Sequence, residues 1–380
     1  MNKLLKTIAG KLIKPSIIFE SKPAFSDNTQ AVYDEFVRRG YGKKYRLFWY
    51  VSYDQCAEIK NERIIYFDPG DRSSLKGKIR NYSFFFRTKC IICCNAFISS
   101  SGSHQLTYGE NQMSFYLSHG TPMKSVKEYY TSPGGIDYMI SAAPELNALM
   151  SDEFSVPKDR VVATGFPRND VFSKNPADLS ALFGNYNKVI IWYPTYRQNV
   201  SHSIELSGNA FPVIHNDINA MQLNNVAAEH NVLIVVKPHF AQDINLLEKI
   251  ELSNIVFIDD SFFEKNKITS YEMLAGSDAL ITDYSSVYFD YTLRDKPIAV
   301  VWEDIEEYKK FPGFAVDLED YLKGAEKVYN IDDLCAFIIS VADNKDRLRA
   351  ERREIRDRVN VSTDGKNTER VVDLITKKIK

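Results

Sequence analysis

Short apolar runs alternate with amphipathic stretches along most of this 380-residue chain, and this alternation restricts the fold more than any other feature. A stretch such as 28–39 has helical spacing, whereas the apolar runs between such stretches read as buried strands. Continuous apolar strands that alternate with helices are typical of parallel sheets covered on both faces. The sequence therefore predicts an α/β protein. The strands that we expect lie at 16–19, 45–51, 63–67, 90–99, 115–117, 189–193, 232–236, 255–258, 279–282 and 298–302.

The length and one change of texture divide the chain. At about 150 residues per domain, 380 residues favour two domains. Turn-forming residues cluster between Gly165 and Lys188, which is typical of a linker. We expect two α/β halves, 1–170 and 186–345, followed by a charged helical segment at 346–380. We interpret the charged run 343–358 as a solvated helix laced by opposite charges.

Charge and cysteine usage exclude some classes of protein. The chain has 48 basic and 50 acidic residues and a net charge of -2, so no global basic field attracts nucleic acid. No apolar stretch reaches the roughly 18 residues that span a bilayer. Three of the five cysteines, Cys90, Cys93 and Cys94, sit in an apolar run and are expected in the core. This usage fits a reducing cytoplasm.

The first fourteen residues form a basic amphipathic segment. Met1, Leu4, Leu5, Ile8 and Leu12 have helical spacing, with lysines largely elsewhere around the helix. Two interpretations remain open. The segment either lies on an anionic membrane surface, at the inner face of the cell membrane, or docks as a helix on the protein itself.

The segment 279–302 carries the strongest local signal for a ligand site. An apolar strand ends at Asp283, and Ser285 and Ser286 begin a helix that we expect to reach about Arg294. Hydroxyls and unpaired N–H groups at such a turn favour an anion, and in an open α/β sheet the turn lies at the carboxyl edge where ligands bind. The alternative is that Asp283 and the serines only cap the helix.

Six motifs together resemble one family. They are FESKPAFSDNTQAVY at 19–33, SHGTPMK at 118–124, GFPRND at 165–170, YPTYR at 193–197, KPH at 237–239 and SDALITDYSSVYFDY at 277–291. In this order they resemble the CDP-glycerol glycerophosphotransferase family, enzymes that prime and polymerise teichoic acids and related capsule polymers. The resemblance extends from near residue 15 to about residue 315.

The resemblance implies a glycosyltransferase-B-type fold, in which two Rossmann-like domains face each other across a cleft. The N-terminal domain would be on the acceptor side, and the C-terminal domain would bind the CDP donor. The implied reaction is attack of an acceptor hydroxyl, on a lipid-linked or polymeric acceptor, at the β-phosphorus of CDP-glycerol, with release of CMP.

Two histidines are the expected catalytic residues. By resemblance His119 is the general base, because a neutral imidazole can accept the proton of an attacking hydroxyl. His239, beside Lys237 after a buried strand, would stabilise the leaving phosphate. The alternatives are a structural loop histidine at 119 and a surface turn set by Pro238. The sequence shows no partner spacing for His104, His202, His215 and His230, and we expect them to be exposed.

The remaining site residues are expected to bind the donor. Arginine suits phosphate oxygens, and a carboxylate suits ribose hydroxyls, although Glu272 is explained nearly as well by stabilisation of a helix start. Ser26, Asp27 and Asn28 would form the acceptor wall or, as we prefer, an N-cap. The expected donor-binding residues are Gly120, Thr121, Pro122, Arg168, Pro194, Thr195, Arg197, Lys237, Glu272, Asp283, Ser285 and Ser286.

The sequence shows no His/Asp/Glu cluster with metal-ligand spacing, so we expect no tightly bound metal, although Mg²⁺ can accompany the donor diphosphate. Three alternative functions remain open. They are a CDP-ribitol-dependent transferase, a sugar-nucleotide glycosyltransferase that binds UDP or GDP, and a non-catalytic binding protein. The length fits a short primase-like protein or a core catalytic domain.

Overall fold

The computed structural model describes residues 14–51, 64–66, 74–76, 79, 83, 86–94, 109–129, 136–174, 176–195, 211–238 and 250–380. The chain forms two compact units. Unit 1 consists of Met1–Thr121, Tyr129–Asp170 and Asp364–Lys380, and unit 2 consists of Pro122–Glu128 and Val171–Thr363. Most of the basic N-terminal segment therefore lies outside the described residues, as do His239 and Arg197.

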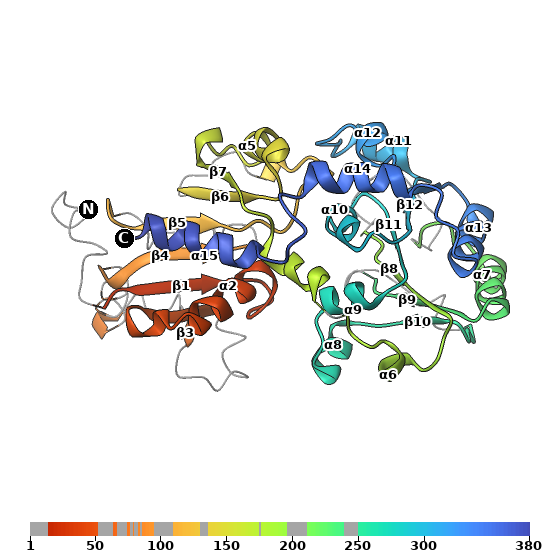
Figure 1. Cartoon of the computed structure of the whole chain (residues 1–380), viewed down its shortest axis with the longest axis horizontal. Helices are drawn as coiled ribbons and strands as arrows, with labels where there is room; N and C mark the ends of the chain where they lie inside the picture. Colours follow the sequence, from red (N-terminus) through yellow and green to blue (C-terminus); the bar gives the residue numbers. More distant parts are fainter. Residues whose placement is uncertain are drawn as a thin grey trace. The chain divides into compact units, whose positions relative to one another are not determined.

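Unit 1 is built on a seven-stranded parallel sheet with the order β3-β2-β1-β4-β5-β6-β7 (Figure 1). The strands are β1 (Ser16–Glu20), β2 (Arg46–Val51), β3 (Ile64–Tyr66), β4 (Thr88–Cys93), β5 (Met113–Tyr116), β6 (Tyr138–Ser141) and β7 (Val161–Ala163). Strand β1 is central, so Phe19 lies beside Trp49 on one neighbour and Ile92 on the other. All three side chains are buried because helices cover the sheet.

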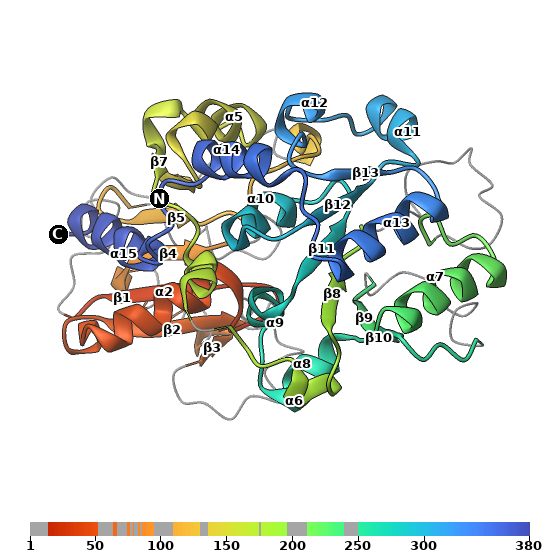
Figure 2. The same ribbon diagram turned by 45° about the vertical axis from the view of Figure 1, so that its right-hand side comes forward.

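The helices of unit 1 include one that comes from the far end of the sequence. Helix α15 packs against α2, and Figures 1 and 2 both show the two helices side by side. The helical elements of this unit are α2 (Asp27–Arg38), η1 (Tyr41–Lys43), η5 (Pro144–Leu146), α5 (Asn147–Glu153), η6 (Lys158–Arg160), η7 (Pro167–Ser173, whose end lies in unit 2) and α15 (Asn367–Lys378).

Unit 2 contains a six-stranded parallel sheet with the order β10-β9-β8-β11-β12-β13. The strands are β8 (Lys188–Trp192), β9 (Val232–Val236), β10 (Ile255–Phe257), β11 (Ala279–Thr282), β12 (Ile298–Val301) and β13 (Glu326–Val328). Helices α7 and α13 pack against each other over this sheet, where Trp192, Leu223 and Ile338 share one apolar core.

Among the residues that the structure describes, unit 2 has ten further helical elements besides η4 (Lys127–Tyr129, whose last residue lies in unit 1). They are α6 (Ser180–Phe183), α7 (Asp217–Glu229), α8 (Asp260–Asn266), α9 (Ser270–Gly276), α10 (Val287–Tyr291), η9 (Thr292–Arg294), α11 (Ile305–Lys310), α12 (Leu318–Tyr321), α13 (Ile331–Ala342) and α14 (Arg349–Val359). Within the part of the chain that the structure describes, no helix is long and apolar enough to cross a membrane.

The two sheets confirm the predicted α/β class and share one strand order. Numbered within each unit, both run 3-2-1-4-5-6, the Rossmann order, and unit 1 adds a seventh strand. In such sheets ligands bind at the carboxyl edge, where the strand order reverses. The reversal lies between β1 and β4 in unit 1 and between β8 and β11 in unit 2.

The C-terminal segment differs from the expectation of one charged, solvated piece. Helix α14 belongs to unit 2, whereas α15 belongs to unit 1. One face of α14 is buried, and Arg352 is only 1% exposed, with its guanidinium donating to the carbonyl of Gly324. The long stem of arginine can pack in a core when its charged head has partners, and Asp346 is that partner here.

Candidate active site

Three segments bring chemistry-bearing residues together at the carboxyl edge of the unit 1 sheet. Asp27 follows β1, His119 follows β5, and Arg168 follows β7. Parallel strands present their carboxyl ends at one edge, so residues far apart in sequence meet there. Asp27 Oδ2 lies 2.5 Å from His119 Nδ1, and Arg168 Nη1 lies 3.0 Å from both oxygens of Asp27.

Two of these three side chains carry charges that are buried. The side chains of Asp27 and Arg168 are 10% and 6% exposed, whereas that of His119 is 65% exposed. Burial alone would raise the pKa of Asp27, but the Arg168 guanidinium, the His119 ring and the Asn28 N–H hold it well below its usual range. Asp27 is therefore an ionised carboxylate that faces one nitrogen of an exposed imidazole.

The carboxylate determines which nitrogen of His119 carries the proton. An ionised Asp27 accepts a hydrogen bond, so it selects the tautomer that carries the proton on Nδ1. The other nitrogen, Nε2, then carries the lone pair of a side chain that is largely exposed. Such an imidazole can take a proton from a hydroxyl that approaches from solvent.

Asn28 fixes the three segments to one another. Its Nδ2 donates to the carbonyls of Leu117 and Ser118, and its Oδ1 accepts from the N–H of Arg168 at 3.0 Å. The Arg168 guanidinium also donates to the carbonyl of His119. Because Asn28 is fully buried, its amide is a rigid link between the loops that carry the histidine and the arginine.

The loop of His119 depends on a glycine. Gly120 has φ 111°, a conformation that side chains rarely adopt, and its carbonyl accepts from the Ser118 hydroxyl. Thr121 is 1% exposed and ends the unit 1 part of this loop. Pro122, by contrast, belongs to unit 2, where the adjoining Met123 accepts a hydrogen bond from the N–H of Ala315.

In unit 2 the expected donor-binding residues gather where the strand order reverses. Beyond the end of β8, the Thr282 hydroxyl donates to the carbonyl of Tyr193, and the N–H of Thr195 donates to Asp283 Oδ2 at 2.8 Å. Asp283 is fully buried. These bonds extend the pairing of β8 and β11 and hold the segment 193–195 at the carboxyl edge.

The other unit 2 residues have mixed settings. Ser285 and Ser286 are partly exposed and precede α10, which the 3-10 helix η9 continues to Arg294, the expected end. Lys237 Nζ lies 3.1 Å from Asp260 Oδ1. The Glu272 carboxylate accepts from the N–H and hydroxyl of Thr269 and so completes a capping box, the helix-start alternative.

One family model covers nearly the whole chain. Residues 5–377 match the model described as CDP-Glycerol:Poly(glycerophosphate) glycerophosphotransferase. The chain belongs to this family. The family assignment agrees with the resemblance that the six motifs carry.

Relatives of this glycerophosphotransferase family match the chain at low identity. The teichoic acid poly(ribitol-phosphate) polymerase of Bacillus spizizenii is 28% identical over 258 residues, which are 62% of this chain and 37% of that protein. The teichoic acid glycerol-phosphate primase of Bacillus subtilis is 23% identical over 330 residues, 82% of this chain and 79% of that protein. The chain thus spans less than half the length of the polymerase.

A solved structure shows the same fold. The wall teichoic acid polymerase TagF superposes with a TM-score of 0.72 and 22% identity, over 99% of this chain and 92% of that one. This likeness confirms the predicted glycosyltransferase-B-type fold of two Rossmann-like domains.

One expectation from the sequence is wrong. Ser26 occupies the N-cap position of α2, but its hydroxyl donates to the carbonyl of Pro23 and does not cap the helix, while Asp27 turns to His119 and Arg168. His215 is exposed, as expected, and its Nε2 contacts the carboxylate of Glu303.

The sequence reasoning preferred an N-cap over a site role for Asp27 and Asn28. The SDN motif was the available signal, but the same letters are typical of a helix start. The partners lie 89 to 141 positions away. Among the described residues, no group of three His, Cys, Asp or Glu side chains is placed to hold a metal.

The depressed pKa of Asp27 predicts how stability changes with pH. Asp27→Asn leaves the Arg168 charge buried without its partner, which costs about 3–5 kcal/mol of unfolding free energy near pH 6. A carboxyl whose folded pKa is depressed stabilises fully above its unfolded pKa, about 3.9, and loses that stabilisation as the pH falls. The difference between wild type and variant should therefore shrink from pH 6 to pH 3 in urea unfolding.

Asp34→Asn controls for the loss of one negative charge from the same helix, since Asp34 is exposed and bonds only Gln30 among the contacts described. A difference between wild type and Asp27→Asn that stays constant over this pH range would contradict the ion pair.

Proposed function

We propose that this protein transfers glycerol phosphate from CDP-glycerol to a hydroxyl of a lipid-linked or polymeric acceptor in the synthesis of a teichoic-acid or capsule-type polymer. The observation that carries the proposal is the buried Asp27–Arg168 pair against an exposed His119, in a chain that belongs to the glycerophosphotransferase family. TagF structures obtained with CDPG show that a protein of this fold takes such a donor.

The reaction requires a general base and positively charged groups around the phosphates. The acceptor oxygen forms a bond to the β-phosphorus, the bond from that phosphorus to the bridging oxygen breaks, and CMP leaves with the α-phosphate. His119 Nε2 takes the acceptor proton and later releases it to solvent. Asp27 holds the ring and stabilises the imidazolium that forms.

We assign the donor to unit 2. The Thr195 hydroxyl and the N–H and hydroxyl groups of Ser285 and Ser286 would donate to the diphosphate, and the Lys237 ammonium would offset its charge. His239 would stabilise the leaving phosphate, and Arg197 would bind the donor. Arg168 is better explained by its bonds to Asp27 and His119 than by direct contact with the donor.

A ribitol donor is the second candidate, because one relative is a poly(ribitol-phosphate) polymerase. The two donors share the cytidine diphosphate and differ in the length of the polyol. No resident metal is required by this proposal, and Mg²⁺ can enter with the donor diphosphate. Running the assay with CDP-glycerol and CDP-ribitol, each with and without EDTA, separates these cases.

Release of CMP tests the role of His119. His119→Gln should lower kcat by about 10²–10⁴-fold, because the proton acceptor is lost, while the KM for CDP-glycerol changes little. His239→Ala should also lower kcat. His230→Gln, at the end of α7, is the matched control and should stay within about twofold of wild type. A near-wild-type rate for His119→Gln would remove the base from the mechanism.

Two aspartates of unit 2 provide a matched pair for the donor site. Asp283 accepts the N–H of Thr195 at the carboxyl ends of β8 and β11, and Asp278 accepts the N–H of Val189 at their amino ends, at 3.0 Å. Asp283→Ala should weaken CDP binding about tenfold, because the segment 193–195 loses its tie. Asp278→Ala should leave the Kd for CDP unchanged.

Isothermal titration with CDP, UDP and GDP measures both effects. Equal weakening by the two substitutions would mean that only the fold is affected, and preferential binding of UDP or GDP would favour a sugar-nucleotide enzyme.

We also propose that residues 1–14 attach the protein to an anionic membrane surface. Lys3, Lys6, Lys11 and Lys14 supply the charge and the leucines the apolar face. Deletion of 1–14 should lower cosedimentation with vesicles that contain phosphatidylglycerol and spare CMP release with a soluble acceptor. Neutral phosphatidylcholine vesicles are the control. Unchanged sedimentation of the deletion variant would favour the docked-helix alternative.

A further inference from the structure

The segment 165–170 connects Asp27 and His119, which we call the acid–base pair, to the last helix of the chain. Both oxygens of the Asp170 carboxylate accept hydrogen bonds from the first turn of α15: Oδ1 from the N–H of Asn367 at 2.8 Å and Oδ2 from the N–H of Thr368 at 2.9 Å. Lys366, at the N-cap position of α15, makes no side-chain cap. Asp170 therefore caps α15 from 197 positions earlier in the sequence.

The contact between this segment and α15 is tight. The Asn367 amide donates to the carbonyl of Phe166, and the Thr368 hydroxyl donates to that of Pro167, both at 3.3 Å. Gly165 has φ 77°, and a Cβ there would lie 2.2 Å from Asn367 Oδ1. A side chain at position 165 would displace the Asn367 amide, which donates to Phe166, so this close contact requires glycine.

The same segment holds the acid–base pair on its other side. Arg168, two residues before Asp170 and in the same 3-10 helix, donates its N–H to Asn28 and its guanidinium to Asp27. A displacement of Asp170 is transmitted through one turn of backbone to these bonds.

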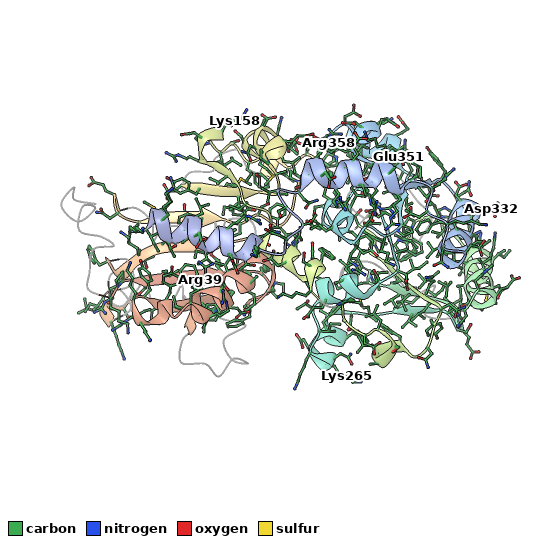
Figure 3. The ribbon with its side chains drawn as sticks, viewed as in Figure 1. Arg39, Lys158, Lys265, Asp332, Glu351 and Arg358 are labelled. Carbon is green, nitrogen blue, oxygen red and sulfur yellow. The ribbon has the colours of Figure 1, made fainter. Side chains whose placement is uncertain are left out.

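Helix α15 also holds α2, the helix that begins with Asp27 and Asn28. Arg39 Nη1 lies 2.5 Å from Asp373 of α15, and Arg39 is labelled at the end of α2 in Figure 3. Arg38 lies 3.9 Å from Glu369. Helix α15 thus contacts both of the elements that supply the partners of His119.

We propose that Asp170 is a positioning residue and that α15, fixed by its cap, braces Asp27 and Arg168 so that Asp27 keeps the proton of His119 on Nδ1. The expected effect on kcat rests on the proposed function, whereas the expected effect on the tautomer of His119 does not. Asp170 itself touches neither substrate nor the imidazole in this arrangement.

The test compares the loss of two helix caps, one at α15 and one at α13. Asp170→Ala removes the cap of α15, and Asn330→Ala removes the cap of α13 in unit 2, a helix that also has 12 residues. Both should lower Tm. In CMP release, Asp170→Ala should lower kcat about 10- to 100-fold at unchanged KM for CDP-glycerol, because misplacement of a catalytic group is costly. Asn330→Ala should keep kcat within about twofold.

The second readout needs no turnover. In the full chain labelled with ¹⁵N-histidine, long-range ¹H–¹⁵N spectra report the tautomer of each ring, and His119→Gln assigns the His119 signal. Wild type and Asn330→Ala should show the proton on Nδ1, and Asp170→Ala should show a mixture of tautomers. Asp170→Asn keeps the side-chain volume and one acceptor, and it replaces Asp170→Ala if that variant does not fold.

An unchanged His119 signal in the Asp170 variant would overturn the proposal, as would an equal loss of kcat in Asn330→Ala. If wild type released no CMP from CDP-glycerol, the proposed function would fail, and the spectra would still decide the role of Asp170.

Discussion

The buried ion pair between Asp27 and Arg168 is the constraint on which the unit 1 site depends. A carboxylate at this depth stays ionised because a guanidinium lies 3.0 Å from both of its oxygens, with the His119 ring and the Asn28 N–H adding to the effect. Apolar side chains of similar volume often serve the stability of a fold as well as a buried ion pair does, so stability alone gives little reason for one. Its useful consequence is the fixed negative charge that it presents to His119.

The shared strand order explains why both units gather polar groups at one edge. In each sheet the first strands are added on one side of the first strand, and the later strands are added on its other side. The loops that follow the two strands at this reversal therefore run in opposite directions, which leaves a crevice at the carboxyl edge. Unit 1 places Asp27 there, and unit 2 places Asp283 there. Asp27 is paired with charged side chains, whereas Asp283 accepts a hydrogen bond from a backbone N–H. The two carboxylates therefore have different roles.

Much of the fold could be predicted because buried parallel strands are continuous apolar runs. Strands such as β1 and β9 are buried along their whole length, and their sequences show it. Strand β13 (EKV) was missed because it is an edge strand in which only Val328 is buried. The pairing of Asp27 with His119 could not be predicted, since the local pattern suits an N-cap and the partner is brought near only by the order of β1, β4 and β5. The buried Arg352 was missed because a dense run of charges conceals which face of α14 packs.

The chain returns to unit 1 after unit 2, so the boundary near residue 170 does not mark the end of unit 1 in the sequence. The turn residues there mark the passage into unit 2, but they also contain Gly165, Arg168 and Asp170, which bind α15 and the acid–base pair. A fragment that ended at 170 would expose the face of α2 that α15 covers and would leave the Asp170 carboxylate without the two N–H groups it accepts. Because α15 follows unit 2 in the sequence, unit 1 acquires this helix only after unit 2 has been synthesised. The first part of the segment that looks like a linker, residues 165–170, therefore belongs to unit 1, and its residues are required by close contacts as well as by the turn.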